Sequence, residues 1–242
     1  MDGKRRLSSA FLIAWSTLIL SSCSSQLQDT ATCRIKINCD DVTTRAYDPD
    51  EELISDVSIM IFDESGMAEE CIWVPHFKEF IEVTLVKGKR YHVRACANFG
   101  YQVYADRMEE LDEIRYHMAY PDEYREGIPM YAEGDGIIIS EDALILLNFK
   151  RLMAKISIRI DRSKLSDDVE MNVRSVRIGN CPKSVKVFGE SSVTGRDQCF
   201  TSGFSRNDYQ ADILNRSDSD GYSGTVSLFM LENMQGKFSE VI

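Results

Sequence analysis

The most regular strand pattern in the chain is Leu152-Met153-Ala154-Lys155-Ile156-Ser157-Ile158-Arg159-Ile160-Asp161. Apolar and polar residues alternate along it, as they do in a β-strand that packs one face on a core. Four apolar side chains are predicted to face that core: Ala154, Ile156, Ile158 and Ile160. Three polar side chains are predicted to face solvent: Lys155, Ser157 and Arg159. This stretch therefore predicts a strand of a layered β-sheet.

Similar short patterns recur along most of the chain. They predict further strands at Cys33–Cys39, Val57–Phe62, Phe80–Val86, Tyr91–Cys96, Gly136–Ile139, Leu144–Phe149, Val173–Ile178, Val185–Phe188 and Thr225–Leu231. Turn residues separate the strands, as in Asp63-Glu64-Ser65-Gly66. A second turn, Lys87-Gly88-Lys89, predicts a hairpin between the strands on either side of it. Short strands at this spacing predict a mostly β protein built of Greek-key β-sandwiches.

One segment departs from this pattern. Residues Tyr104–Met118 place apolar side chains at helical spacing with acidic residues between them. They predict one short helix near 104–118. We interpret this helix as a cap on an open end of a sandwich; a partner-binding helix is the alternative.

Residues 1–22 have the features of a secretory signal. Lys4, Arg5 and Arg6 precede an uncharged run from Leu7 to Ser22. This run is rich in serine and shorter than the roughly 20 apolar residues that a spanning helix needs. We therefore expect residues 1–22 to be a cleaved signal peptide.

The end of this run, Leu20-Ser21-Ser22-Cys23, resembles the lipobox of bacterial lipoproteins. The resemblance implies that Cys23 becomes the acylated first residue and that several acyl chains tether the chain to a membrane. The alternative is an ordinary signal peptide with Cys23 incidental. The small polar residues at 23–31 are predicted to form a flexible tether between lipid and fold.

The charge balance excludes several classes of partner. Removal of residues 1–22 takes away Lys4, Arg5, Arg6 and Asp2, which leaves 25 basic and 38 acidic residues and a net charge of −13. Nucleic acid needs a basic face, so it is an unsuitable partner. Electrostatic attraction of the whole chain to anionic lipid is disfavoured for the same reason.

The sequence offers little for catalysis or metal binding. Three histidines are present, His76, His92 and His117, and their spacing is not that of metal ligands. No nucleophile elbow, phosphate loop or dinucleotide fingerprint occurs. We therefore predict a protein that is not an enzyme and that uses no metal and no cofactor.

Six cysteines follow Cys23: Cys33, Cys39, Cys71, Cys96, Cys181 and Cys199. An even number in an exported protein suggests disulfides. However, Cys33 and Cys39 lie on one predicted strand at roughly 20 Å from each other, which is too far for a bridge. Cys96 lies in a strand that reads as buried, where cysteine serves as a small core residue. We expect mostly free thiols.

The strands divide into two groups. We place a domain boundary near residue 150, with an N-terminal β-sandwich at 32–150 and a C-terminal β-sandwich at 151–242. The second group has only four or five predicted strands, which is few for a closed sandwich. Either this domain is truncated, or it needs a strand from elsewhere.

Several motifs occur in an order that resembles the fimbrillin superfamily of type V pili, and its anchor subunits in particular. After the lipobox come Glu52–Asp63, Arg94-Ala95-Cys96-Ala97-Asn98-Phe99-Gly100, Gly127-Ile128-Pro129-Met130, Leu152-Met153-Ala154-Lys155-Ile156 and Leu231-Glu232-Asn233-Met234-Gln235-Gly236. The resemblance implies tandem transthyretin-like β-sandwich domains and assembly by exchange of a β-strand with partner subunits. The chain departs from the family pattern because relatives continue further beyond the last motif.

The resemblance also implies a function and a location. We expect a fimbrial anchor or accessory subunit, held at the cell outer membrane by acyl chains on Cys23 and joined to other fimbrial subunits. Stalk subunits of the family are cut after an arginine, so Arg45-Ala46 is a candidate processed bond. Asp29-Thr30-Ala31 resembles a bacterial O-glycosylation signal, which makes Thr30 a candidate site. The alternative function is a surface glycan-binding lipoprotein, for which Trp73 is the candidate stacking residue.

Overall fold

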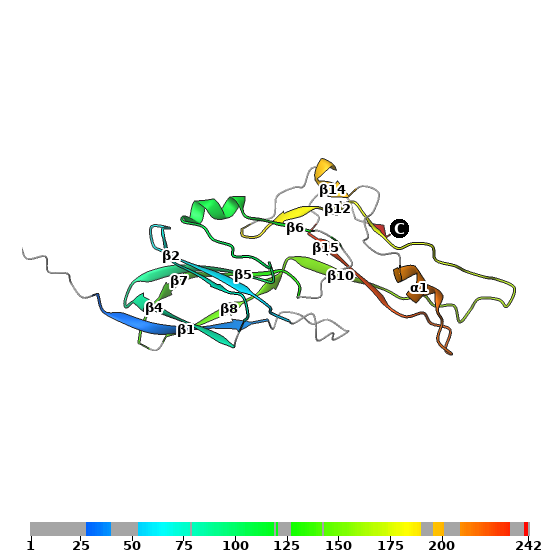
Figure 1. The fold of residues 1–242 in the computed structure, drawn as a ribbon, viewed down its shortest axis with the longest axis horizontal. Coiled ribbons are helices and arrows are strands. Elements are labelled where there is room, and N and C mark those ends of the chain that lie inside the picture. The colour runs from blue at the N-terminus through cyan, green and yellow to red at the C-terminus, as the bar shows by residue number, and fades with distance from the viewer. Residues whose placement is uncertain are drawn as a thin grey trace, which may run out of the picture.

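The computed structural model describes residues 28–39, 53–77, 79–118, 120, 127–141, 143–189, 196–200, 209–232 and 240–241. Within these ranges the chain is mostly β (Figure 1). The strands of the first two sheets are β1 (Thr30–Asn38), β2 (Val57–Asp63), β3 (Ala68–Val74), β4 (Phe80–Val86), β5 (Arg90–Ala97), β7 (Met130–Ile138), β8 (Leu144–Asn148) and β9 (Lys150–Arg151). The remaining strands are β6 (Arg115–His117), β10 (Met153–Ile158), β11 (Ile178–Gly179), β12 (Cys181–Pro182), β13 (Ser184–Lys186), β14 (Cys199–Phe200), β15 (Val226–Leu231) and β16 (Glu240–Val241). The helical segments are two short 3-10 turns, η2 (Met108–Glu113) and η3 (Arg196–Gln198), and the helix α1 (Tyr209–Asn215). No helix among the described residues is long and apolar enough to cross a membrane.

A three-stranded sheet in the order β4-β1-β8 forms one layer. Its central strand, β1, runs antiparallel to β4 and parallel to β8. Alternate side chains of β1 point inward and are buried: Ala31, Cys33 and Ile35. The side chains between them are exposed, so the strict alternation seen in the sequence reflects one covered face and one open face.

A five-stranded antiparallel sheet in the order β3-β2-β5-β7-β9 forms the second layer. The two layers stack as a β-sandwich, with β1, β4 and β8 beneath β2, β5 and β7 in Figure 1. Their facing side chains form the first core, which includes Ile35, Ile59, Val93, Ile145 and Leu147. The predicted β-sandwich class is confirmed.

The five-stranded sheet is covered on its other face as well. The side chains of Met60, Phe62 and Cys96 point away from the first core and enter a second one. That second core takes its remaining members from residues 99–118, 128 and 152–231. Strand β2 is therefore buried on both faces, which explains why its sequence is a continuous apolar run without alternation.

The C-terminal part of the chain forms small two-stranded sheets, β10–β15, β11–β16, β12–β14 and β13–β6. The longest pair is β10–β15, which extends away from the sandwich toward α1 (Figure 1). Ile156, Ile158 and Ile160 of the predicted strand pack against the second core but are only half-buried. Ala154 is exposed, so its predicted inward position is wrong; the buried residue at this end is Met153.

The predicted short helix near 104–118 is present as the 3-10 turn η2, which ends before Arg115–His117 because that segment pairs with β13. Two further expectations need correction. The strands β4 and β5 do not form a hairpin, because β4 pairs with β1 and β5 pairs with β2 and β7. The predicted strand at 173–178 is regular only at its end, and the backbone of Val173 bonds the Asn215 side chain instead.

Candidate strand-exchange edges

Strand β1 connects two strands that are not paired with each other in the sheet. On one side its register with β4 runs from Thr30 opposite Val86 to Lys36 opposite Phe80. On the other side its register with β8 begins with Arg34 opposite Leu144. Loss of β1 would separate β4 from β8 and expose unpaired backbone groups on both, together with the pockets that its side chains fill.

Both ends of β1 are fixed to neighbouring loops. At its start, the N–H of Lys87 donates to the Asp29 carbonyl at 2.8 Å, and the Lys87 ammonium lies 2.8 Å from Glu141 and 3.0 Å from Asp29. These carboxylates, Glu141 foremost, raise the pKa of Lys87 above its ordinary value. At its end, the N–H of Phe149 donates to the Asn38 carbonyl at 2.8 Å. The strand is therefore held along its length and at both ends.

The second candidate edge is β10. Within the part of the chain that the structure describes, β10 has one partner strand, β15, which pairs with it from Met153 opposite Leu231 to Ile158 opposite Val226. A two-stranded ribbon is weak unless a further strand or layer covers it. The half-buried isoleucines of β10 fit a surface that an added strand would complete.

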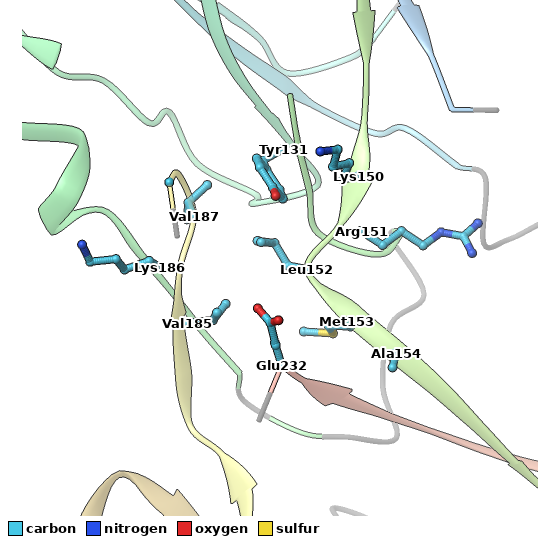
Figure 2. A pocket seen from close by; sticks show the side chains of 11 residues that line it. Tyr131, Lys150, Arg151, Leu152, Met153, Ala154, Val185, Lys186, Val187 and Glu232 are labelled. Atoms are coloured by element: carbon cyan, nitrogen blue, oxygen red, sulfur yellow. The ribbon is translucent and has the colours of Figure 1, made fainter. Parts of the chain in front are cut away.

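A cavity of about 380 Å³ lies beside the start of β10. Its lining residues are Tyr131, Lys150, Arg151, Leu152, Met153, Ala154, Val185, Lys186, Val187, Gly189 and Glu232. Figure 2 shows the Tyr131 hydroxyl and the Glu232 carboxylate directed toward Leu152 from opposite sides, whereas Lys186 and Arg151 point away. The cavity can therefore take an apolar side chain with a polar group at its rim.

The residues predicted as sites are distributed as follows. Cys23, Arg45 and Ala46 lie outside the described residues. Thr30 is the first residue of β1 and is exposed, so the strand begins inside the segment that was predicted as a flexible tether. Trp73 lies on β3, an outer strand of the five-stranded sheet, and 41% of its surface is exposed.

Asn98 has a structural role that no motif in the sequence predicted. Its side-chain nitrogen donates to the carbonyls of Leu53 and Ile128, and its oxygen accepts from the N–H of Ser55. Three of the motifs that carried the family resemblance therefore meet at this side chain. The available signal was an asparagine directly after a strand, where its φ of 64° is one that asparagine tolerates better than most residues.

None of the six cysteines that the structure describes forms a disulfide, and four of them are buried: Cys33, Cys96, Cys181 and Cys199. Burial raises the pKa of Cys33 and Cys96, and raises that of Cys181 to about 12. These thiols are therefore protonated and serve as small core residues. No group of three or more metal-binding side chains occurs among the described residues.

Comparison with known proteins gives similarity at the level of structure. No family model and no curated sequence matches the chain. A proposed cell adhesion protein from Bacteroides eggerthii has 14% identity and a TM-score of 0.57, over 88% of this chain and 78% of that one. A fimbrilin from Porphyromonas gingivalis has 15% identity and a TM-score of 0.53, over 68% of this chain and 53% of that one. The fimbrial anchor protein Mfa2 from Porphyromonas gingivalis has 10% identity and a TM-score of 0.50, over 88% of this chain and 76% of that one.

These neighbours share the layered β architecture described above, and they are fimbrial or cell adhesion proteins. The resemblance read from the sequence motifs and the resemblance found in three dimensions therefore point to the same group of proteins. The chain therefore shares the layered β-sandwich fold of these fimbrial and cell adhesion proteins of Bacteroidetes.

Proposed function

We propose that the chain is an anchor or accessory subunit of a fimbrium. In this proposal acyl chains on Cys23 hold it at the outer membrane, and a β-strand exchanged with a partner subunit joins it to the fibre. The domains at 32–150 and 151–242 then have different tasks. The first connects the lipid to the folded body, and the second receives the partner.

The observation that carries the proposal is the position of β1. It begins at Thr30, seven residues after Cys23, and it is paired on both sides in a sheet whose inner face is buried. A pulling force on the lipid would therefore load β1 along its length, against two ladders of hydrogen bonds and the packing of Cys33 and Ile35. A tether that entered the fold at a loop would lack this resistance.

In this proposal strand β1 keeps the folded body on the lipid only while the chain between β1 and β2 is uncut. Because β1 links Cys23 to the body, a cut after Arg45 would separate the covalent chain of the body from the lipid. It would also allow β1 to leave and a partner strand to take its place. We propose that the uncut chain is the anchor and that it receives its partner along β10, with one apolar side chain of the partner in the cavity lined by Leu152 and Glu232.

Membrane fractionation of cells tests the anchor. The variant Cys23→Ala is expected to leave the membrane fraction, whereas Cys39→Ala, a cysteine beyond the end of β1, is expected to remain there. Retention of Cys23→Ala in membranes after an alkaline carbonate wash would contradict the lipid tether.

Calorimetry tests the strand exchange. A peptide from a partner subunit's terminal strand is expected to release heat on binding the full chain. The variant Leu152→Glu, which places a charge in the cavity, is expected to abolish that heat, and Ser157→Ala, an exposed position of β10 that does not line the cavity, is expected to keep it. Absence of heat with every candidate strand would remove this part of the proposal.

A second candidate, binding of a surface glycan, is favoured by one observation. Val103 bonds Ser58, the cross-strand neighbour of Trp73, and Ala105 accepts a bond from the Cys71 thiol, so the backbone of residues 103–105 runs beside β3. Tyr104 is 66% exposed and Trp73 is 41% exposed, and exposed aromatic rings suit stacking on a sugar. Glycan binding that is lost in Trp73→Ala, without any response to partner strands, would favour this candidate.

A further inference from the structure

The outer face of the three-stranded sheet carries exposed apolar side chains on both of its outer strands. Phe80 of β4 is 47% exposed, and Leu144 and Leu146 of β8 are each 58% exposed. Their neighbours Ile81, Ile145 and Leu147 are buried on the opposite face. A regular strand that shows large apolar residues on its solvent face marks a surface for contact. We call this surface the outer face of β4-β1-β8.

The register of the sheet places basic residues between the apolar ones. Lys36 lies opposite Phe80 on one side and opposite Leu146 on the other. In the next row, Arg34 lies between Glu82 and Leu144.

Two contacts hold the Arg34 side chain across the sheet. Its guanidinium carbon lies 5.5 Å from the centre of the Phe80 ring, and its Nε lies 3.5 Å from a Glu82 carboxylate oxygen. These two rows contain two basic side chains, Arg34 and Lys36, and one acidic side chain, Glu82. By contrast, the mature chain as a whole has a net charge of −13. The outer face therefore differs in charge from the rest of the molecule.

We propose that the outer face of β4-β1-β8 rests on the surface of the bilayer that holds the anchor. The proposal rests on the lipid tether at Cys23 set out above. Phe80, Leu144 and Leu146 would enter the headgroup region, and Arg34 and Lys36 would meet lipid phosphates. The contact depends on apolar side chains and local charge, so it does not need the whole chain to be attracted to anionic lipid.

The length of the tether fits this placement. Seven residues from Cys23 to Thr30 span at most about 25 Å, and Arg34 lies about 13 Å further along β1. The whole outer face is thus within reach of the membrane surface. Because the lipid keeps the face beside the bilayer, a contact too weak to hold a free protein is sufficient.

The proposal is tested with tryptophan as a depth probe. In a Trp73→Phe background, Leu146→Trp places the single tryptophan of the mature chain on the outer face. The matched control is Val169→Trp, which replaces an exposed valine between β10 and β11, a segment that Figure 1 places at the opposite end of the molecule from β1. Each variant is bound to phosphatidylcholine vesicles with and without bromine on the acyl chains. One arm uses the acylated chain, and the other uses a chain with an N-terminal polyhistidine tag, without acylation, on nickel-chelating lipid.

Brominated lipid is expected to quench the fluorescence of Leu146→Trp in both arms and to leave Val169→Trp unquenched. Equal quenching of the two probes, or quenching of neither, with the tagged chain still on the vesicles would overturn the proposal. If only the acylated arm fails to bind vesicles, the tether at Cys23 is wrong and the tagged arm still decides the outer face.

Discussion

The side-chain nitrogen of Asn98 donates a hydrogen bond to the carbonyl oxygen of Ile128 at 2.8 Å. The same nitrogen reaches the carbonyl of Leu53 at 2.8 Å, and the side-chain oxygen accepts from the N–H of Ser55 at 2.8 Å. One side chain thus joins the segment before β2, the end of β5 and the segment before β7. Gly127 lies against it so closely that an added Cβ would come within 2.3 Å of the Asn98 nitrogen and 2.4 Å of the Leu53 carbonyl oxygen.

Replacement of Asn98 is therefore expected to lower the free energy of unfolding, through lost hydrogen bonds and, for residues other than glycine, through backbone strain. Asn98→Gly keeps the φ of 64° without strain but loses three hydrogen bonds, at about 1 kcal/mol each, so the free energy of unfolding should fall by about 3 kcal/mol. Asn98→Ala should lose about 1 kcal/mol more, because alanine is strained at this φ. Urea denaturation measures both changes. A matched change, Asn148→Ala, loses one exposed hydrogen bond and should cost about 0.5 kcal/mol or less; a cost for Asn98→Gly no larger than this would show that the three bonds are not needed.

Local pattern was enough to find most strands of the sandwich. The alternation in Cys33–Cys39 and Phe80–Val86 and the apolar run at Val57–Phe62 correspond to β1, β4 and β2, because each reflects how many faces of the strand are covered. The turn at Asp63–Gly66 was also predicted, and the Asp63 carboxylate accepts from the N–H of Ser65 there.

The order of the strands within each sheet could not be predicted from these local patterns. Alternation tells which side chains point inward but not which strand lies alongside, so the contact of β1 with β8, more than a hundred residues later, left no local signal. The same limit produced the incorrect hairpin of β4 and β5. The helical spacing at 104–118 located a short helix but not its length, because only Met108–Glu113 makes a helical turn and Arg115–His117 is a strand.

Acid is expected to weaken the fold through Asp135. Burial acts to raise the pKa of this carboxyl, but hydrogen bonds from His92 at 2.8 Å and Arg94 at 2.9 Å outweigh it and leave the pKa below its ordinary value of 3.8. A lowered pKa in the folded state adds stability that is present above the unfolded value and is lost as the pH falls below about 4.

Urea midpoints measured across this acid range test the role of Asp135. As the pH falls, the urea midpoints of Asp135→Asn and Arg94→Met should each fall less steeply than that of the original chain. The double variant should show the same pH dependence as Asp135→Asn alone, because both changes remove the same interaction. Identical acid profiles for all of these chains would contradict the assignment.

Alkali is expected to weaken the fold through the buried thiols. The pKa of Cys181 is raised from 9.0 to about 12 by burial, and that of Cys96 is raised by burial and by the charge of Asp56. A raised pKa adds stability that is fully present below the unfolded value and is lost as the pH climbs from about 9 toward the folded value. Cys181→Ala should flatten this decline above about pH 9 even if it lowers stability at neutral pH. Cys71 serves as the comparison: burial raises the pKa of its thiol as well, but the residue is exposed, so Cys71→Ala should flatten the decline less than Cys181→Ala does.

The last prediction concerns the strand on which anchoring depends. Ile35 is fully buried at the centre of β1, so Ile35→Ala should lower the free energy of unfolding by about 2–5 kcal/mol. Lys36→Ala, one residue later on the exposed side, should change it by about 0.5 kcal/mol or less. After a specific cut between β1 and β2, the Ile35→Ala chain should also lose its β1 fragment faster than the Lys36→Ala chain on gel filtration, because inward packing and not the outward side chain retains the strand. If the cut chains release β1 equally fast, the hydrogen-bond ladders alone hold the strand, and a partner strand would need to match only its backbone and not its inward side chains.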